Sequence, residues 1–251
     1  HMHYSSYIYY NIYTVYLKEN KEEFVLLLSN KTTILICKRL HILKGVHLMD
    51  IKNIYSELLD LHLSVDNLKK RADELNIYPN SIQEKDSSIL FLSKGKSEKQ
   101  LIILRKGPIY EAFEGKEVVR EGIKLCPLNE ANSKTLRELF PYTAPTSHRE
   151  HDITIGLGDR LGIASPGHIR LIKDYSVFPV LAQQSIRELN LTDRTYEDVL
   201  NAASWAVFQE GYTKGFGADG DHLKTHEEVD MALHHGYTMI TLDCSEHIDN
   251  D

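Results

Sequence analysis

The stretch GFGADGDHLKTHEEVDMALHHGYTMITLD, residues 215–243, decides the fold. GFGAD, at residues 215–219, reads as a glycine-rich strand, and YTMITLD, at residues 237–243, reads as an apolar strand. Between them Thr225 and Glu228 have the spacing of a capping box, and Gly236 suits the end of the helix that this box opens. A strand, a helix and a second strand in this order predict two parallel strands joined by a right-handed crossover.

The same pattern extends upstream. DITIGLG (152–158) and VFPVLAQ (177–183) are predicted strands. Between them Ser165 is expected to cap a helix that has Pro166 at its first position and runs through residues 169–175. TYED (195–198) resembles a capping box with Asp as its acid, and it opens a helix that Gly211 ends. One face of that helix is apolar, through Val199, Leu200, Ala203, Ala206 and Val207.

Three strand-helix units followed by a fourth strand fit two α/β architectures. One is an open, doubly wound sheet, and the other is the first half, about four βα units, of a TIM-type (β/α)8 barrel, which usually takes about 250 residues. We expect the half-barrel, preceded by a smaller α+β N-terminal region. This reading requires a protein that continues past Asp251, so the chain is expected to be truncated at its C-terminus.

Residues 3–145 have a mixed pattern and are expected to form an α+β accessory domain of unknown role. EEFVLLL (22–28) and TTILICKRL (32–40) are predicted strands, and residues 53–75 carry apolar residues at helical spacing. SSILFLS (87–93) and KQLIILRKG (99–107) are predicted to pair as a hairpin. The proline-bearing, polar segment 139–152 marks the expected boundary with a second domain, residues 146–251. His1 and Met2 are interpreted as a remnant of expression.

The composition excludes several classes of protein. A net charge of −7 argues against non-specific nucleic-acid binding, which requires a basic surface. No apolar run approaches the roughly 18 residues that span a bilayer, so no membrane partner is expected. The three cysteines contain no CxxC pair, which gives no sign of a structural zinc site or a disulfide framework. A cytoplasmic location is therefore expected.

Ligands of parallel α/β sheets bind at the carboxyl ends of the strands, so the residues there are candidate site residues. Each has an ordinary alternative: an Asp can cap a helix, an Arg can be a surface charge, a Gln can bond the loop backbone, and the last residues can be a solvated tail. In chain order the candidates are Asp159 and Arg160, then Gln183, Gln184, Ser185 and Arg187, then Asp219, Asp221 and His222, then Asp243, Ser245, Glu246 and His247.

The group Asp219-Gly220-Asp221-His222 is the most informative of these. Thr225 already caps the following helix, so capping does not explain the acids. Small residues beside them would let a ligand approach the backbone closely. Imidazole and carboxylate are common ligands of zinc-like metals, but a catalytic zinc usually takes three protein ligands. The remaining ligands are expected at His247 or beyond Asp251.

Five segments together resemble the tagaturonate epimerase family. They are GDRLGIASPGHIR, FPVLAQQSIREL, RTYEDVLNAASWAVFQEGY, GFGADGDHLKT and GYTMITLDCSEHI, which cover residues 153 to about 249. The motifs AQQS-R-E, WAVFQEGY and GFGAD-DH are long and unusual, whereas residues 3–150 match the family only loosely.

The resemblance implies a bacterial, metal-dependent epimerase of hexuronate catabolism that interconverts D-tagaturonate and D-fructuronate by inversion at C4. In the family motif GADxDH the second Asp is the proton acceptor and the following His is a metal ligand, which correspond to Asp221 and His222. The family's proton donor and other metal ligands would lie beyond Asp251, so this chain alone is expected to be inactive. Two alternatives stay open: a divalent-metal aldolase acting on a related sugar acid, and a non-catalytic sugar-binding fragment.

Overall fold

The computed structural model describes residues 16–19, 22–25, 64–95, 98–119, 122–147, 151–245 and 248. The chain divides into two compact units, residues 1–57 and 58–251. In the first unit β1 (Tyr16–Glu19) and β2 (Glu22–Val25) form an antiparallel hairpin in which Tyr16 is opposite Val25. The predicted strand at residues 32–40 lies outside the described residues, and so do residues 53–63 of the predicted helix.

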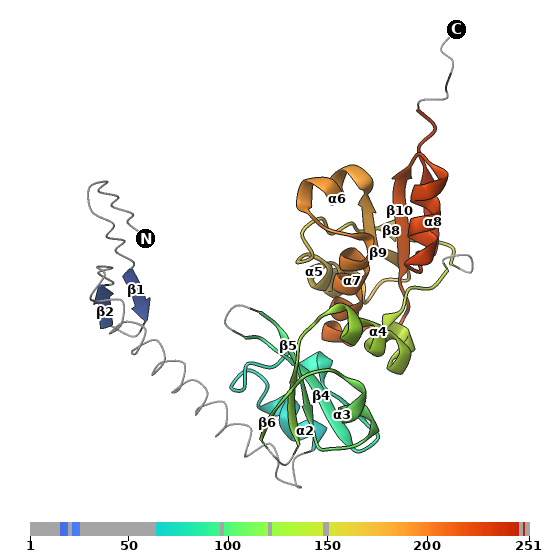
Figure 1. Ribbon diagram of the computed structural model, residues 1–251. Helices are drawn as coiled ribbons and strands as arrows, with labels where there is room; N and C mark the ends of the chain where they lie inside the picture. The colour runs from blue at the N-terminus through green and yellow to red at the C-terminus, as the bar shows by residue number, and fades with distance from the viewer. Residues whose placement is uncertain are drawn as a thin grey trace. The chain divides into compact units, whose positions relative to one another are not determined.

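The second unit begins with an antiparallel sheet of five strands in the order β3-β4-β5-β7-β6 (Figure 1). The strands are β3 (Gln83–Lys85), β4 (Ser88–Ser93), β5 (Gln100–Leu104), β6 (Lys116–Val119) and β7 (Ile123–Cys126). The predicted hairpin is confirmed as β4 and β5, with Ile89 opposite Leu104. The helix predicted over 53–75 is too long, because among the described residues α2 covers only Val65–Lys70 and residues 71–76 form turns.

Short helices connect the strands of this sheet and lead out of it. They are η1 (Pro79–Ser81), α3 (Pro108–Ala112), α4 (Glu130–Leu139) and η2 (Pro141–Thr143). The side chain of Asn129 caps α4 by accepting a hydrogen bond from the amide of Asn132.

A parallel sheet of four strands follows, in the order β11-β10-β9-β8. Its strands are β8 (Thr154–Gly156), β9 (Phe178–Ser185), β10 (Gly217–Leu223) and β11 (Met239–Leu242). The predicted mixed α/β class and the four predicted parallel strands are confirmed. Each strand lies beside the next one in the sequence, as expected when every connection crosses over through a helix.

Four helices make these connections: α5 (Ser165–Ile172), α6 (Ile186–Thr192), α7 (Tyr196–Glu210) and α8 (His226–His234). The capping boxes predicted at Thr195 and Thr225 are both formed. Gly211 ends α7 in the left-handed conformation, with φ of 60°, as predicted for a C-terminal glycine.

Three details of the predicted connections are wrong. Ala164, not Ser165, is the N-cap residue of α5, and Ser165 is its first helical residue. This helix ends at Ile172 and does not continue to Tyr175, whose amide donates to the carbonyl of Ile172 in a tighter turn. Helix α6 was not predicted, although Ser185 and Glu188 form its capping box.

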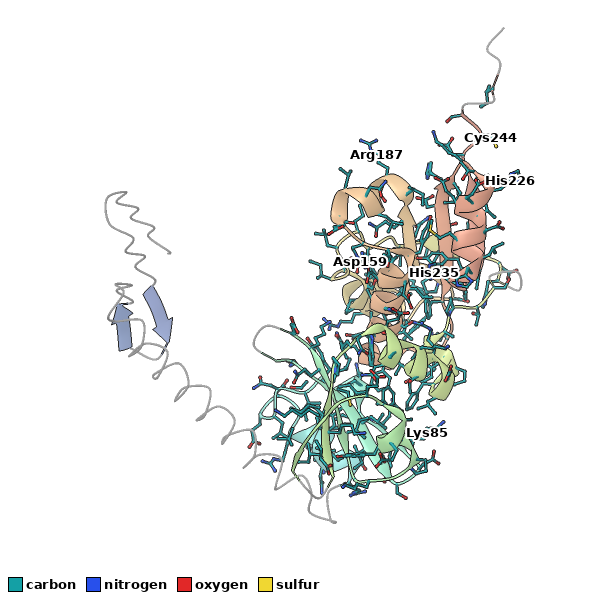
Figure 2. The ribbon with its side chains drawn as sticks, viewed as in Figure 1. Lys85, Asp159, Arg187, His226, His235 and Cys244 are labelled. Carbon is teal, nitrogen blue, oxygen red and sulfur yellow. The ribbon has the colours of Figure 1, made fainter. Side chains whose placement is uncertain are left out.

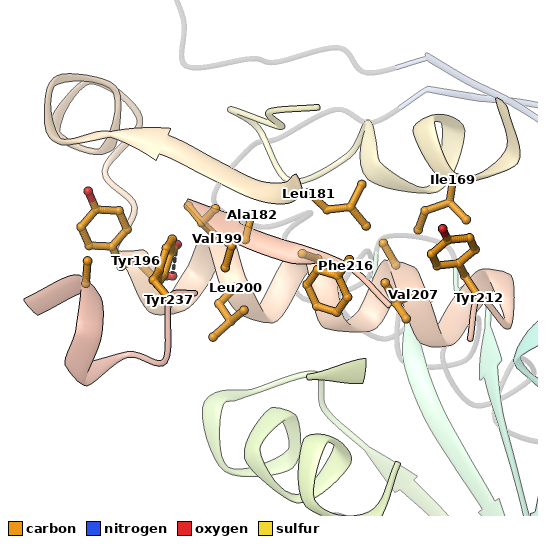
Figure 3. Close-up of a cluster of buried hydrophobic side chains, with 14 of the residues drawn as sticks. Ile169, Leu181, Ala182, Tyr196, Val199, Leu200, Val207, Tyr212, Phe216 and Tyr237 are labelled. Carbon is orange, nitrogen blue, oxygen red and sulfur yellow. Dashed lines mark hydrogen bonds between the residues drawn. The ribbon is translucent and has the colours of Figure 1, made fainter. Parts of the chain in front are cut away.

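Helix α7 packs against both sheets of the second unit. Its predicted apolar face is buried against the parallel sheet, in a cluster that includes Val199, Leu181 and Phe216 (Figure 3). Each large apolar side chain buried in this way contributes about 1.5–3 kcal/mol. Trp205 and Phe208 lie in the core of the antiparallel sheet. The indole N–H of Trp205 donates to Oγ of Ser133 on α4 at 2.7 Å. The boundary predicted at residues 139–152 stays a prediction.

Candidate functional site

A cleft of about 1090 Å³ opens at the carboxyl ends of β9 and β10, and we call it the strand-end cleft. Helix α6 lines one side of it, the end of β10 and the start of α8 line another, and Asp243 follows β11. Figure 2 shows Arg187 of α6 and Cys244, which follows β11, at the same end of the unit. The lining residues are Arg160, Ser185, Ile186, Arg187, Glu188, Asn190, Leu191, Thr192, Asp221, His222, Lys224, Glu228 and Asp243.

Six of the predicted site residues therefore line one cleft: Arg160, Ser185, Arg187, Asp221, His222 and Asp243. They come from four different segments of the chain and meet because the strands are parallel and adjacent. The sequence predicted that Asp221 and His222 follow a strand, whereas β10 includes both and ends at Leu223. His247 lies outside the described residues.

Asp221 and His222 form a pair at the edge of the strand-end cleft. Oδ1 of Asp221 lies 2.8 Å from Nδ1 of His222. The side chain of His222 is 62% exposed and that of Asp221 is 19% exposed, so the imidazole is the more accessible of the two. With Nδ1 engaged by the carboxylate, Nε2 of His222 is left available for a ligand.

A β-bulge creates this arrangement. Gly220 pairs with Ile240 and Leu223 pairs with Leu242, so β10 advances three residues while β11 advances two. Within the bulge His222 has φ of 55°, in the left-handed region that residues other than glycine rarely adopt. Such a conformation costs about 1–3 kcal/mol and is often found at functional sites. Bulges also redirect side chains beside active sites, as this one does for His222.

The two arginines of the cleft differ in their partners. Nε of Arg160 pairs with Oε1 of Glu188, the acid of the α6 capping box. Arg187 is exposed, and its side chain makes no hydrogen bond or ion pair with another described residue. Its guanidinium is therefore available to a ligand in the cleft, whereas that of Arg160 is already paired.

Asp219 lies below the cleft and is fully buried. It accepts hydrogen bonds from Nε2 of Gln183 at 3.1 Å and from Oγ1 of Thr241 at 2.8 Å. Burial raises the pKa of Asp219 and nearby Asp221 adds to this effect, while the hydrogen bonds from Thr241 and Gln183 act against it. Asp219 and Gln183, both predicted to bind substrate, thus contact each other inside the sheet.

Gln184 lies next to α6, and Asp159 lies next to α5. Gln184 is buried, donates to Oγ1 of Thr192 at 3.1 Å and accepts from Nη1 of Arg194 at 3.1 Å. Asp159, 4% exposed, accepts from the amides of residues 163–165 at 2.7–3.0 Å and from the hydroxyl of Ser165. Asp159 thereby accepts hydrogen bonds from amides at the start of α5, as expected if an Asp after a strand caps a helix and does not bind a ligand.

The carboxylate of Asp243 is held by its own loop. The amide of Ser245 donates to Oδ1 of Asp243 at 3.0 Å. The side chain of Ser245 and then this amide, both as hydrogen-bond partners, hold the pKa of Asp243 below its usual value. Nζ of Lys224 lies 3.7 Å from Oδ2 of Asp243. Lys224 and Glu228 also line the cleft but were not predicted as site residues, because neither directly follows a strand end in the predicted scheme.

A protein site for a metal ion requires several coordinating side chains close together. Within the described ranges, no three side chains of His, Cys, Asp or Glu gather closely enough to form such a site. His222 fits one ligand position, because a carboxylate on one ring nitrogen is the usual support of a metal-bound imidazole.

Of the helices in the described ranges, none is both long enough and apolar enough to cross a membrane.

Comparison with known proteins identifies the family of the chain. Residues 78–251 match the model of a family described as tagaturonate epimerase. The chain belongs to the tagaturonate epimerase family. It is 44% identical over 177 residues to the tagaturonate/fructuronate epimerase of Thermotoga maritima, and these residues are 69% of this chain and 36% of that relative.

Crystal structures of a member from Cohnella laeviribosi resemble the chain closely. The structure of its fructuronate-tagaturonate epimerase with one glycerol has a TM-score of 0.70 and 44% identity, over 80% of this chain and 38% of that one. The native structure has a TM-score of 0.68 and 47% identity, over 74% and 38%. The chain therefore spans less than two fifths of the length of these members of the tagaturonate epimerase family.

Proposed function

We propose that this chain is part of an isomerase that interconverts D-tagaturonate and D-fructuronate by inverting C4. The observation that carries the proposal is the meeting of Asp221, His222 and Arg187 in the strand-end cleft of a chain from the tagaturonate epimerase family. The cleft offers a carboxylate as a base, an imidazole and a free guanidinium, which together suit a sugar acid.

Arg187 is the residue that we assign to the substrate carboxylate. An arginine guanidinium can donate two parallel hydrogen bonds to a carboxylate. The choice of Arg187 over Arg160 rests on the pairing of Arg160 with Glu188.

Asp221 is assigned as the base. In these substrates the ketone is at C2, so the acidified C–H bond is at C3, and a carbanion at C4 would have no conjugation to the ketone. A retro-aldol route avoids this difficulty. Asp221 takes the proton of the C4 hydroxyl, the C3–C4 bond breaks, and an aldehyde and an enediolate form. After rotation of the aldehyde the enediolate adds to its other face, and Asp221 returns the proton to the C4 oxygen.

His222 is assigned as a ligand of a divalent, zinc-like metal ion. Such an ion would supply Lewis-acid stabilisation of negative charge that develops on the substrate oxygens. The contact between Asp221 and Nδ1 of His222 supports this role, because it would fix the ring with Nε2 directed away from the carboxylate. A proton transfer from a positioned carboxylate accelerates a reaction by roughly 10²–10⁴-fold. The metal and the retention of both fragments must therefore supply most of the remaining rate acceleration.

We further propose that the four parallel strands are the first part of a (β/α)8 barrel. Their sequential order supports this, since neighbours in a barrel are also neighbours in the sequence. We expect the proton donor and the other metal ligands in the remaining length of the family's proteins. We therefore expect the 251-residue chain alone to be inactive.

The test is to incubate the full gene product that carries this sequence with D-tagaturonate and a divalent metal, and to identify the products by NMR. Formation of D-fructuronate is expected. Accumulation of the two three-carbon fragments, dihydroxyacetone and an aldehyde acid, in place of the epimer would indicate the aldolase alternative. Binding of tagaturonate with no conversion would support a sugar-binding protein and overturn the proposal.

A further inference from the structure

A row of three polar side chains crosses the parallel sheet beneath the strand-end cleft. Asp219 of β10 is the Cα partner of Gln183 on β9 and of Met239 on β11. Side chains alternate along a strand, so Thr241, two residues beyond Met239, is on the same face as Asp219. The carboxylate of Asp219 joins the row through the hydrogen bonds from Gln183 and Thr241, and the hydroxyl of Thr241 lies 2.8 and 3.1 Å from its two oxygens.

Asp219 cannot contact a ligand in the cleft in this arrangement. Its side chain is fully buried, and it is not among the residues that line the cleft. No Lys, Arg or His of the described segments forms an ion pair with it. A buried carboxylate requires hydrogen-bond donors, and here they come from two different strands. The carboxylate therefore cross-links β9, β10 and β11.

This cross-link lies at the base of the bulge that presents Asp221 and His222. Asp219 and Gly220 are the last residues of β10 that pair regularly with β11, and regular pairing resumes only at Leu223. Beyond the bulge the amide of Asp243 donates to the carbonyl of Leu223 at 2.8 Å. The left-handed backbone at His222 requires support from its surroundings, and the row through Asp219 provides side-chain hydrogen bonds three residues before it.

We propose that Thr241, together with Gln183, is a positioning residue that holds Asp219 as a fixed support for the Asp221–His222 bulge. Neither residue touches the substrate; each acts through Asp219 on the direction in which Asp221 and His222 face the cleft. The expected effect of Thr241 and Gln183 on catalysis rests on the proposed function. Their structural role in supporting the bulge does not depend on any activity.

The first test measures the bulge directly in the 251-residue chain. Thr241→Val removes the hydroxyl at nearly constant volume, and Thr241→Ser restores it. Thr143→Val is the control for the same substitution elsewhere: Thr143 is fully buried, whereas Thr241 is half-buried, and Thr143 donates only to backbone carbonyls near α4. Hydrogen exchange of the Asp243 amide should become at least about tenfold faster in Thr241→Val, because a buried carboxylate that loses a hydrogen-bond donor destabilises its surroundings on this order. It should stay near wild type in Thr241→Ser and Thr143→Val. Unchanged exchange in Thr241→Val would overturn the proposal.

The second test measures kinetics of the same variants in the full gene product. Thr241→Val should lower kcat by about 10- to 100-fold with little change in KM, and Thr241→Ser should recover most of it. Faster exchange with a wild-type kcat would show that the row is structural only and would also overturn the proposal. A wild-type gene product with no activity on tagaturonate would instead remove the proposed function, and exchange alone would then decide whether Thr241 supports the bulge.

Discussion

His222 carries a cost in stability that its substitution can reveal. A left-handed backbone costs an L-residue about 1–2 kcal/mol, whereas glycine adopts it freely. Glycine also loses more entropy on folding than alanine, which offsets about 0.4–1 kcal/mol of that gain. At φ of 55° His222→Gly should therefore be more stable than His222→Ala by about 1 kcal/mol. The imidazole is largely exposed and its contact with Asp221 is lost in both variants, so those terms cancel.

Thermal unfolding of the two variants measures this difference. For a unit of this size about 1 kcal/mol corresponds to roughly 2–4 °C in Tm. The control is Lys134, an exposed residue within α4, where Lys134→Ala should be more stable than Lys134→Gly by about 1 kcal/mol. The order of Gly and Ala should thus reverse between the two sites. Equal stability at His222, or a more stable alanine, would contradict the left-handed bulge. In the full gene product both His222 variants should lose bound metal.

Three further predictions concern the acids and arginines of the site. Asp221→Asn should abolish turnover in the full gene product while its metal content, measured by elemental analysis, stays near wild type; turnover within about tenfold of wild type would remove Asp221 as the base. Arg187→Lys should raise KM for tagaturonate far more than for tagatose, which lacks the carboxylate, and Arg160→Lys should not; equal effects on both sugars would refute the assignment. Burial acts to raise the pKa of Asp159, but the hydrogen bonds from residues 163–165 prevail and lower it below 3.8. Wild type should therefore have a larger free energy of unfolding than Asp159→Asn above pH 3.8, and this difference should shrink as the pH falls through the folded pKa. Urea unfolding at several pH values measures it, and a difference that stays constant from pH 7 to 3 would exclude this linkage.

Local signals in the sequence predicted most of the parallel sheet. The capping boxes at Thr195 and Thr225 and the glycine at Gly211 act within one helical turn, so their residue types determine the helix ends directly. The box formed by Ser185 and Glu188 has the same pattern but was not predicted, because the polar residues after the second predicted strand were assigned as candidate site residues. Helix α6 is consequently the part of the cleft that the sequence analysis missed.

The site was predictable only in part, for a physical reason. The carboxyl ends of parallel strands lie at one edge of the sheet, and this explains why Asp221, His222 and Arg187 meet. The bulge at His222 and the partners of Asp219 depend on the register between β10 and its neighbours, and Thr241 lies 22 residues away from Asp219 in the sequence. No local pattern fixes that register. Asp159 could be either a cap or a ligand from its sequence position, and only its contacts with the start of α5 distinguish the two.

The most direct test of the proposed C4 inversion follows a deuterium label at C4. D-Tagaturonate that carries deuterium at C4 is incubated in ordinary water with the full gene product and a divalent metal, and the products are followed by NMR. The retro-aldol route through Asp221 breaks the C3–C4 bond and leaves the C4–H bond intact. D-Fructuronate should therefore form with the label retained at C4. Loss of deuterium to water at a rate that matches turnover, or the absence of the C4 epimer, would contradict it.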